Sequence, residues 1–200
     1  MSLAVAVSIF VIGYSKQIES ANKFGGFALI GAVVAGLAWY VPETFRPPAG
    51  TPPIHDIATD PANPLPFVAI APLRADAANN MDYGVMPGID TVQQHIDMQL
   101  EAYPDIQPQT FSASPEEIFQ RALDAVQTMG WELVDADSAT GRIEATDTTF
   151  WFRFKDDVVI QVADAGGETV LQARSLSRVG RGDVGKNAAR LREFFALLNN

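Results

Sequence analysis

The C-terminal half of the chain shows the clearest pattern of hydrophobic and polar positions. Between Ser114 and Gly130 the apolar residues fall on one face of a helix. Ser114, Pro115 and Glu117 have the spacing of a helix-capping box, and Gly130 suits the position after the last turn. The pattern therefore predicts a helix over residues 115–129. Its apolar face is formed by Ile118, Leu123, Val126 and Met129.

Four segments after this helix are rich in β-branched and aromatic residues, and turn residues separate them. The predicted strands are 131–137, 141–154, 157–165 and 168–177. A second helix with an apolar face is predicted over 186–200. Because short turns imply antiparallel pairing, residues 112–200 are predicted to be an α+β domain. In it, two helices flank an antiparallel four-stranded sheet, similar to a helix-grip arrangement.

Proline dominates the middle of the chain, since all 13 prolines lie between positions 42 and 115. Proline removes a backbone donor and favours extended geometry, so residues 45–111 are predicted to be an extended segment. The segment also contains apolar residues, and we expect it to wrap along the domain or along a partner. One short helix is predicted at 91–102, with Val92, Ile96 and Leu100 on one stripe.

Residues 1–44 are predicted to be a membrane anchor of one or two transmembrane helices. Residues 25–41 carry no charge, and their length is near the lower limit for spanning a bilayer. Trp39 and Tyr40 stand at one end, where amphipathic rings favour the headgroup region. Residues 2–14 form a second apolar run. We favour a hairpin of two helices, and a signal peptide followed by an anchor is the alternative.

The connector between the two apolar runs predicts their orientation. It contains Lys16 and Lys23, and the positive-inside rule places it in the cytoplasm. The following domain is then expected on the periplasmic side of a bacterial inner membrane. Gly31 and Ala35 would let another helix approach closely. We therefore expect another integral membrane protein or complex to be the partner, contacted through residues 25–90.

Charge is distributed unevenly along the 200 residues, whose formal net charge is −10. Residues 51–172 carry 20 acidic and five basic side chains, whereas residues 173–192 carry six basic and one acidic. The acidic balance argues against nucleic acid as a partner, because phosphate binding needs a positive surface. No cysteine is present, which excludes disulfides, thiolate metal sites and a cysteine nucleophile.

The basic segment contains the sequence GRGDVGKN at residues 180–187, which has the spacing of a phosphate-binding P-loop. A P-loop enzyme places this motif early, after its first strand, and needs a Ser or Thr hydroxyl where Asn187 stands. Only 13 residues follow Asn187, too few for the rest of that fold. We therefore reject a nucleotide-hydrolysing site and predict no cofactor.

Two interpretations of this C-terminal motif remain. In the first it is structural: Asp183 caps the next helix, Asn187 clamps the loop, and Gly180 and Gly185 permit unusual backbone geometry. In the second it binds a small anion or a lipid headgroup at a helix N-terminus. The candidate ligand-binding residues are Arg174, Arg178, Arg181, Lys186 and Asn187.

Asp156 and Asp157 are candidates for a catalytic or cation-binding pair. Adjacent residues of a strand point to opposite faces, so they are not expected to share a ligand. The favoured interpretation is a hairpin turn after residues 150–154, with one aspartate paired to Arg174 or Arg178. The alternating Phe150, Phe152 and Phe154 are predicted to lie in the sheet core. The intervening face of Trp151, Arg153 and Lys155 is a candidate for contact with lipid headgroups or a partner.

Other catalytic or metal-binding patterns are weak. His55, Asp56 and Asp60 form a loosely spaced group in a Pro-rich loop, and we predict no metal site there. Ser175 and Ser177 lack the strand–turn–helix context of a nucleophilic serine. No residue is therefore predicted to be catalytic.

Several of these stretches together resemble the DUF1499 family over residues 52–197. The resemblance rests on the upstream segment 52–64 and on two motifs. The matching positions are Phe154, Asp156, Asp157, Val158, Arg174, Ser175, Ser177, Arg178, Gly180, Asp183, Gly185, Asn187 and Arg190. Members are membrane-anchored or lipoprotein-like, and the resemblance implies no activity. Lipoprotein members carry cysteines that this chain lacks.

The leading hypothesis from the sequence is a non-catalytic interaction module, an accessory subunit of a membrane protein complex. Binding of a small anionic or lipidic ligand at the basic C-terminal loop is the second hypothesis. A hydrolase that uses Asp156, Asp157 or His55 is the third.

Overall fold

The structure is a computed structural model that describes residues 30–36, 40 and 50–199. The chain divides into two units, residues 1–46 and 47–200. In the first unit, residues 30–36 are helical. None of the helices in the described ranges is long and apolar enough to cross a bilayer. The apolar runs 2–14 and 25–41, predicted to be membrane helices, lie wholly or mostly outside the described residues.

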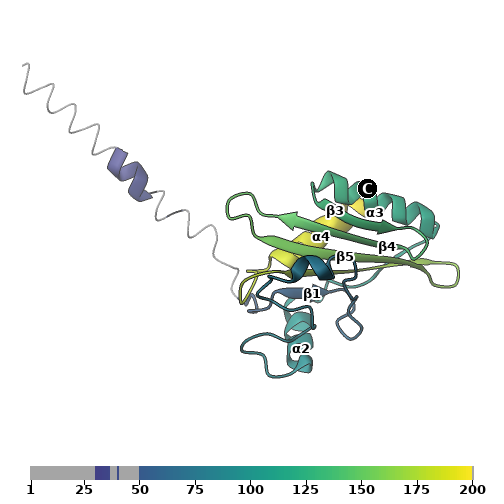
Figure 1. The fold of residues 1–200 in the computed structure, drawn as a ribbon, viewed down its shortest axis with the longest axis horizontal. Helices are drawn as coiled ribbons and strands as arrows, with labels where there is room; N and C mark the ends of the chain where they lie inside the picture. Colours follow the sequence, from purple (N-terminus) through teal and green to yellow (C-terminus); the bar gives the residue numbers. More distant parts are fainter. Residues whose placement is uncertain (1–29, 37–39, 41–49, 200) are drawn as a thin grey trace, which may run out of the picture. The chain divides into compact units, whose positions relative to one another are not determined.

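The second unit contains an antiparallel sheet of six strands within its described residues, whereas the sequence predicted four. The strands are β1 (Asp56–Ala58), β2 (Gln109–Phe111), β3 (Glu132–Asp137), β4 (Arg142–Thr148), β5 (Lys155–Asp164) and β6 (Thr169–Ser177). Strands β3 to β6 form a meander in chain order (Figure 1). β1 and β2 both pair with β6, near its C-terminal and N-terminal ends respectively.

The two additional strands come from the Pro-rich part of the chain. Each is three residues long, too short to display the period-two pattern by which a strand is recognised. The sheet therefore begins at Asp56, and a boundary at residue 112 would divide it. Part of the segment predicted to wrap is thus an integral part of the sheet.

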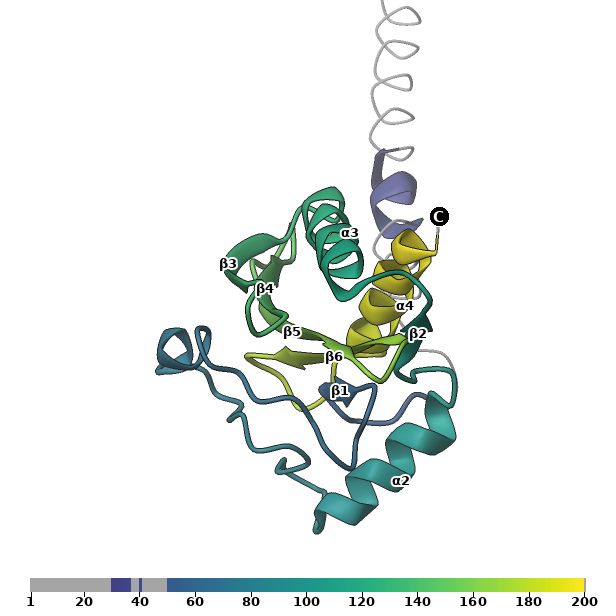
Figure 2. The same ribbon diagram turned by 90° about the vertical axis from the view of Figure 1, so that its right-hand side faces the viewer.

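Three α-helices and one short 3-10 helix accompany the sheet in the described part of the second unit. They are α2 (Val92–Ala102), α3 (Pro115–Thr128), α4 (Lys186–Leu198) and η1 (Ala71–Arg74). α3 begins as predicted, since the Ser114 hydroxyl accepts a hydrogen bond from the Glu117 backbone N–H at 3.3 Å. Gly130 follows its end with φ +70°. Figure 2 shows α3 and α4 over one face of the sheet and α2 on the opposite side.

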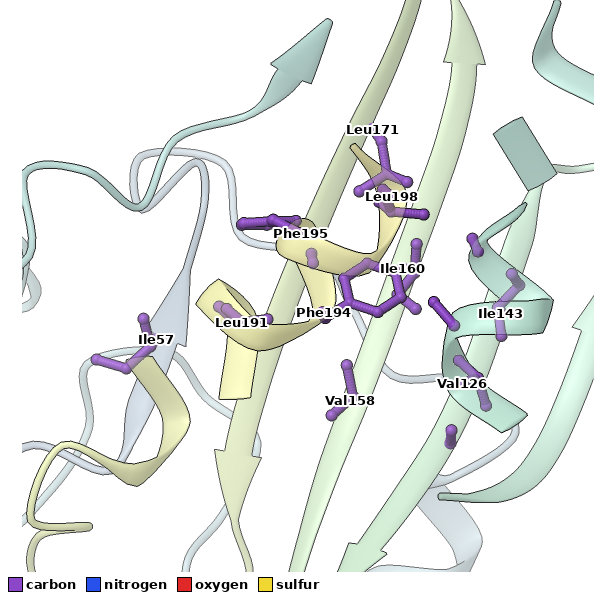
Figure 3. Close-up of a cluster of buried hydrophobic side chains, with 14 of the residues drawn as sticks. Ile57, Val126, Ile143, Val158, Ile160, Leu171, Leu191, Phe194, Phe195 and Leu198 are labelled. Carbon is purple, nitrogen blue, oxygen red and sulfur yellow. The ribbon is translucent and has the colours of Figure 1, made fainter. Parts of the chain in front are cut away.

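The main core lies between the sheet and the α3–α4 layer. Figure 3 shows Phe194 and Leu198 of α4 directed toward the sheet, near Ile160 and Leu171. Phe194 is fully buried and stacks on Trp131, with 5.7 Å between the ring centroids. Burial of these large side chains is the main favourable contribution to the stability of this layer.

A second, smaller core lies on the other face of the sheet. Phe67 and Ile70 of the Pro-rich segment pack there against Val159 of β5 and Leu176 of β6. Neighbouring residues of β5 thus serve different cores, because Val158 belongs to the main core and Val159 to the smaller one. The Pro-rich segment therefore wraps along its own domain.

Helix α2 forms where predicted, but the side of the helix that is buried differs from the predicted one. Val92 and Leu100, expected on its apolar stripe, are 45% and 40% exposed, whereas His95 and Gln99 are fully buried. The Gln99 side chain accepts from the Ala58 N–H at 3.1 Å and donates to the Ala58 carbonyl at 2.7 Å. Pairing with the β1 backbone therefore decides which face of α2 is buried.

The segment 141–154 does not form one long strand. β4 ends at Thr148, and the chain turns through residues 149–154 into β5. The predicted core positions Phe150, Phe152 and Phe154 are exposed in this turn. The predicted turn at Asp156 and Asp157 is also wrong, because both residues lie within β5.

Candidate functional site

Asp157 is the centre of an ion cluster on the sheet face that the Pro-rich segment covers. Its carboxylate is fully buried. One oxygen accepts from Arg74 and from Arg178 Nε at 2.9 Å. The other accepts from Arg178 Nη2 at 2.9 Å and from the Thr146 hydroxyl at 2.7 Å. Both oxygens are therefore occupied, which fits the predicted pairing with Arg178.

Arg74 is a charged member of this cluster that was not predicted from the sequence, and Thr146 was not predicted either. It lies at the end of η1 and also donates to the Asn79 carbonyl at 3.0 Å. Burial lowers the pKa of Arg74, whereas the hydrogen bond to Asp157 raises the pKa of Arg178. A signal was present, because Arg74 is the single cation between residues 51 and 120.

Arg174 makes a second buried ion pair on the same face. Its guanidinium donates two hydrogen bonds to Asp56 of β1, at 2.9 and 2.8 Å. It also donates to the carbonyls of Leu65 and Met81 at 2.8 and 2.7 Å and lies over the ring of Phe67. The partner of Arg174 is thus Asp56, and neither Asp156 nor Asp157.

Glu144 of β4 holds the same segment through its backbone. The fully buried carboxylate accepts from the N–H groups of Val68 and Ile70, both at 2.8 Å. Charge-assisted bonds of this kind are stronger than neutral ones. They replace the ladder hydrogen bonds that an irregular, Pro-rich segment does not make. We call Asp56, Arg74, Glu144, Asp157, Arg174 and Arg178 the sheet-face cluster.

Asn187 is the centre of a second network on the α4 side of the sheet. Its Nδ2 donates to the His55 carbonyl at 3.0 Å and to the Ser177 hydroxyl at 2.9 Å. Its Oδ1 accepts from the Ser175 hydroxyl and from Arg190 Nη1, both at 2.6 Å. Asn187 is fully buried. Its amide joins the start of α4 to β6, through Ser175 and Ser177, and to the chain at His55.

Arg190 joins this network to Asp156. Its Nη2 donates to Asp156 at 2.5 Å and to Asp147 at 2.8 Å. Asp156 thus faces α4 while Asp157 faces the Pro-rich segment. The expectation that the two aspartates do not share a ligand is confirmed by these contacts.

Asp183 accepts a hydrogen bond from the first turn of α4, whose N-cap residue is Gly185, in agreement with the structural interpretation of the motif. Its carboxylate accepts from the backbone N–H groups of Gly185 at 2.8 Å and Asn187 at 2.7 Å. Burial raises the pKa of Asp183, and these two hydrogen bonds oppose that effect. Gly180 and Gly185 have φ values of +99° and +82°, which explains the preference for glycine at both positions.

The five candidate ligand residues are therefore placed in two groups. Arg174, Arg178 and Asn187 are engaged in the networks above. Arg181 and Lys186 have exposed side chains, and the Arg181 carbonyl accepts from His55 Nδ1 at 3.4 Å. The cations of the basic segment are thus not gathered around one centre.

The acids of the loosely spaced group at residues 55–60 likewise have different partners. Asp56 binds Arg174, and Asp60 accepts from the N–H groups of Ala62 at 3.2 Å and Asn63 at 3.1 Å. Among the residues that the structure describes, no three His, Asp or Glu side chains are arranged to hold a metal ion.

A pocket of about 450 Å³ lies beside the N-terminus of α4. Its polar lining includes Lys186, Arg192 and Tyr103. The Tyr103 hydroxyl has no hydrogen-bond partner among the described residues, although the side chain is only 7% exposed. Burial also raises the pKa of Tyr103. Arg192 pairs with Asp105 at 2.5 Å.

Asp156, Asp157, Arg174, Ser175, Ser177, Arg178, Asn187 and Arg190 of the two networks belong to the motifs noted in the sequence. The family model described as "Protein of unknown function (DUF1499)" matches residues 56–198. The chain belongs to this family. The match begins at β1, in agreement with a domain that includes the upstream strand.

A comparison with curated protein sequences yields no significant match. Among solved structures, the chain is similar to the "Crystal structure of Ara h 8.0201", with 14% sequence identity and a TM-score of 0.35. That similarity covers 46% of this chain and 92% of the other.

Proposed function

We propose that this DUF1499 protein is a non-catalytic, membrane-anchored interaction module. It serves as an accessory subunit or partner of a membrane protein complex, with residues 47–200 on the periplasmic side of a bacterial inner membrane. The observation that carries the proposal is the internal pairing of the charged residues in the family motif. They stabilise a rigid domain that displays its other surfaces to a partner.

The sheet-face cluster supports this role because it joins separate parts of the chain. Arg174 connects β6 to β1, and Asp157 connects β5 to η1 through Arg74. A catalytic carboxylate must reach its substrate. Asp157 is instead fully buried, and three side chains donate to its two oxygens.

The membrane placement is supported by the sequence of the first unit. The uncharged run 25–41, the rings of Trp39 and Tyr40, and the lysines of the preceding connector favour an anchor with a cytoplasmic connector. Small residues on this run favour contact with a second transmembrane helix.

On the Pro-rich segment, fewer residues are available for contact with a partner than the predicted range 25–90 includes. Ile54, Ile57, Phe67 and Ile70 are buried in this chain's own cores. The side chains available on the described part of the segment include Val68, Leu73 and Val85, which are 49%, 54% and 52% exposed. We propose that these outward side chains contact the partner, together with the anchor.

Isolation of the tagged full chain in a mild detergent tests this function. We expect a membrane protein complex of fixed stoichiometry, identified by mass spectrometry. The combined variant Val68→Ser and Val85→Ser should lose the partner. Leu133→Ser is the matched control, because Leu133 is similarly exposed, at 45%, but lies on β3. Recovery of the chain alone, in repeated preparations, would contradict the proposal.

A second candidate function is binding of a small anion in the pocket beside α4. Lys186 supplies positive charge, whereas Arg192 is already paired with Asp105, and the buried Tyr103 hydroxyl is an unused donor beside them. The Asp183 carboxylate at the same helix end opposes an anion. Arg178 is already paired with Asp157 and Arg181 lies outside the pocket, so the pocket remains the place where such a ligand fits.

Calorimetric titration of the full chain with inorganic phosphate tests this second candidate. Lys186→Gln and Tyr103→Phe should each weaken binding, by about tenfold for the charge. Arg181→Gln removes an exposed cation outside the pocket and should have little effect. Equal weakening by Arg181→Gln, or no binding of phosphate, would refute an anion site in this pocket.

A further inference from the structure

The turn between β4 and β5 displays four aromatic side chains to solvent. Phe150, Trp151 and Phe152 are 78%, 79% and 73% exposed, and Phe154 is 51% exposed. Single exposed apolar residues are common on protein surfaces, but a contiguous group of large rings indicates an interaction site. We call residues 149–155 the aromatic tip.

The two ends of the aromatic tip are joined by hydrogen bonds of the turn itself. The Thr149 N–H donates to the Phe154 carbonyl at 2.9 Å, and the Arg153 N–H donates to the Thr149 carbonyl at 3.1 Å. The Phe154 N–H donates to the Thr149 hydroxyl at 2.9 Å. Internal pairing lowers the free-energy cost of moving a backbone into a medium that is poor in water.

The rings also support one another. Phe150 and Trp151 form an edge-to-face pair with 5.1 Å between centroids, and Phe152 stacks on Phe154 at 5.5 Å. Both arrangements are favourable geometries for aromatic pairs. The rings thus form a compact apolar end on the hairpin. It lies at the opposite end of the sheet from the β3–β4 turn, because β4 joins the two turns.

The charge of the aromatic tip is opposite in sign to that of the molecule. Residues 149–155 contain Arg153 and Lys155 and no acid, in a chain of net charge −10. Both cations have exposed side chains, and the Lys155 ammonium lies 4.0 Å from the exposed Glu132 carboxylate of β3. Phe and Trp together with Arg and Lys are the residues that favour the headgroup region of an anionic bilayer.

The apolar surface continues from the tip onto the domain. Leu73 and Val179, which are 54% and 41% exposed, line a depression of about 280 Å³ with Arg153, Phe154 and Lys155. Figure 1 shows the turn between β4 and β5 at the free end of these two strands. Such a turn fits a deformable lipid interface, whereas a protein partner would need a groove of matching shape.

We propose that the aromatic tip inserts into the interfacial region of an anionic phospholipid bilayer. The rings enter at the level of the headgroups, and Arg153 and Lys155 contact lipid phosphates. This inference rests on the membrane placement in the proposed function and adds a second, lipidic contact to it. Insertion would restrict the orientation of residues 47–200 at the bilayer surface.

Site-specific labelling of the full chain tests the inference, because the chain has no cysteine. Trp151→Cys and Ser138→Cys each accept one environment-sensitive fluorophore, at opposite ends of the sheet. Ser138 lies in the β3–β4 turn and is exposed, so it is the matched control. Each labelled chain is reconstituted into phosphatidylcholine vesicles with about 30% phosphatidylglycerol, with and without a spin-labelled lipid that quenches the fluorophore.

We expect quenching and a blue shift of the emission at position 151 but not at position 138. Phe150→Ser together with Phe152→Ser should reduce the quenching at 151 to that of the control position. Arg153→Gln together with Lys155→Gln should reduce it in anionic vesicles. Equal quenching at 138 and 151, or none at 151, would overturn the inference. A spectral change at 151 without quenching by lipid would also overturn it, in favour of a protein contact.

Flotation of the same vesicles distinguishes failure of the aromatic tip inference from failure of the proposed function. If the chain floats with the vesicles while the label at 151 is not quenched, the aromatic tip inference is wrong and the membrane placement stands. If the chain does not float with the vesicles, both are wrong.

Discussion

At the scale of single residues, the buried carboxylate of Asp157 illustrates how this domain uses charge. A buried ion pair is expensive to desolvate, so its members need several hydrogen bonds to compensate. Asp157 accepts from Arg74, Arg178 and Thr146. The pairing supplies the countercharge of the buried Arg74 and of the partly buried Arg178.

Asp157→Asn should therefore lower the free energy of unfolding by about 3–5 kcal/mol, because it leaves two arginines without their countercharge. Urea unfolding measures this change. Asp76→Asn, at an exposed acid, is the control and should change stability by less than about 0.5 kcal/mol. Similar midpoints for the two variants would show that the cluster does not contribute to stability.

His95 predicts a pH dependence. It is fully buried against the ring of Tyr83, and neither ring nitrogen makes a hydrogen bond of normal geometry among the described residues. Burial lowers its pKa below the ordinary 6.5, although Asp56 nearby favours the charged form. His55 and Arg174 disfavour that form.

The direction in which stability changes with pH follows from the lowered pKa of His95. Below pH 6.5 the unfolded chain binds a proton that the folded chain resists, so stability falls as the pH decreases. We expect the free energy of unfolding to decrease between about pH 7.5 and about pH 5.5. His95→Phe keeps a ring of similar shape and should reduce this dependence. The same pH dependence in the variant would assign it to other groups.

At the scale of elements, the β3–β4 turn shows how a close backbone approach selects glycine. Gly141 has φ +72°, and a Cβ at this position would lie 2.1 Å from the Val162 carbonyl oxygen. The same two residues are joined by a hydrogen bond from the Val162 N–H to the Gly141 carbonyl at 2.8 Å. Gly130, at the end of α3, has φ +70° but no heavy atom within 4 Å of such a Cβ.

Substituting the two glycines therefore distinguishes the cost of backbone strain alone, at Gly130, from the cost of strain and steric collision together, at Gly141. Gly130→Ala should cost about 1–2 kcal/mol of stability, the cost of a left-handed backbone alone. Gly141→Ala should cost about 1–3 kcal/mol more, because the Cβ also displaces β5. Chemical denaturation of both variants measures the difference. Equal losses would mean that β5 moves away at negligible cost.

At the scale of the whole molecule, the two cores and both polar networks lie in residues 47–200. This unit includes β1, which supplies Asp56 to Arg174, and η1, which supplies Arg74 to Asp157. The upstream segment is thus a structural component of the domain. Removing it would expose β6 and leave buried charges unpaired.

A fragment of residues 47–200 should consequently fold with an unfolding midpoint close to that of the full chain. A fragment of residues 112–200 should not fold, because it lacks β1, β2 and the partners of Arg174. Circular dichroism and thermal unfolding of the two fragments measure this. Cooperative unfolding of residues 112–200 would show that the upstream segment is dispensable.

The local pattern of the sequence determined much of this fold. The capping box of α3, the positions of α2 and α4, the antiparallel meander and the family were all predicted from spacing and residue type. The α4 cap by Asp183 and the opposite faces of Asp156 and Asp157 were predictable too. Each depends on neighbours in the chain, for which propensity and periodicity are informative.

The tertiary structure alone decided the features that depend on distant residues. β1 and β2 are too short to show a pattern and exist because β6 offers an unpaired edge. Arg74 meets Asp157 across 83 positions of sequence, so no local signal pairs them. The phenylalanines of the aromatic tip alternate with other residues as in a strand. However, β4 ends at Thr148 and β5 begins at Lys155, so the residues between them form a turn. A local pattern reports period and propensity, whereas pairing and exposure are set by what the rest of the chain places nearby.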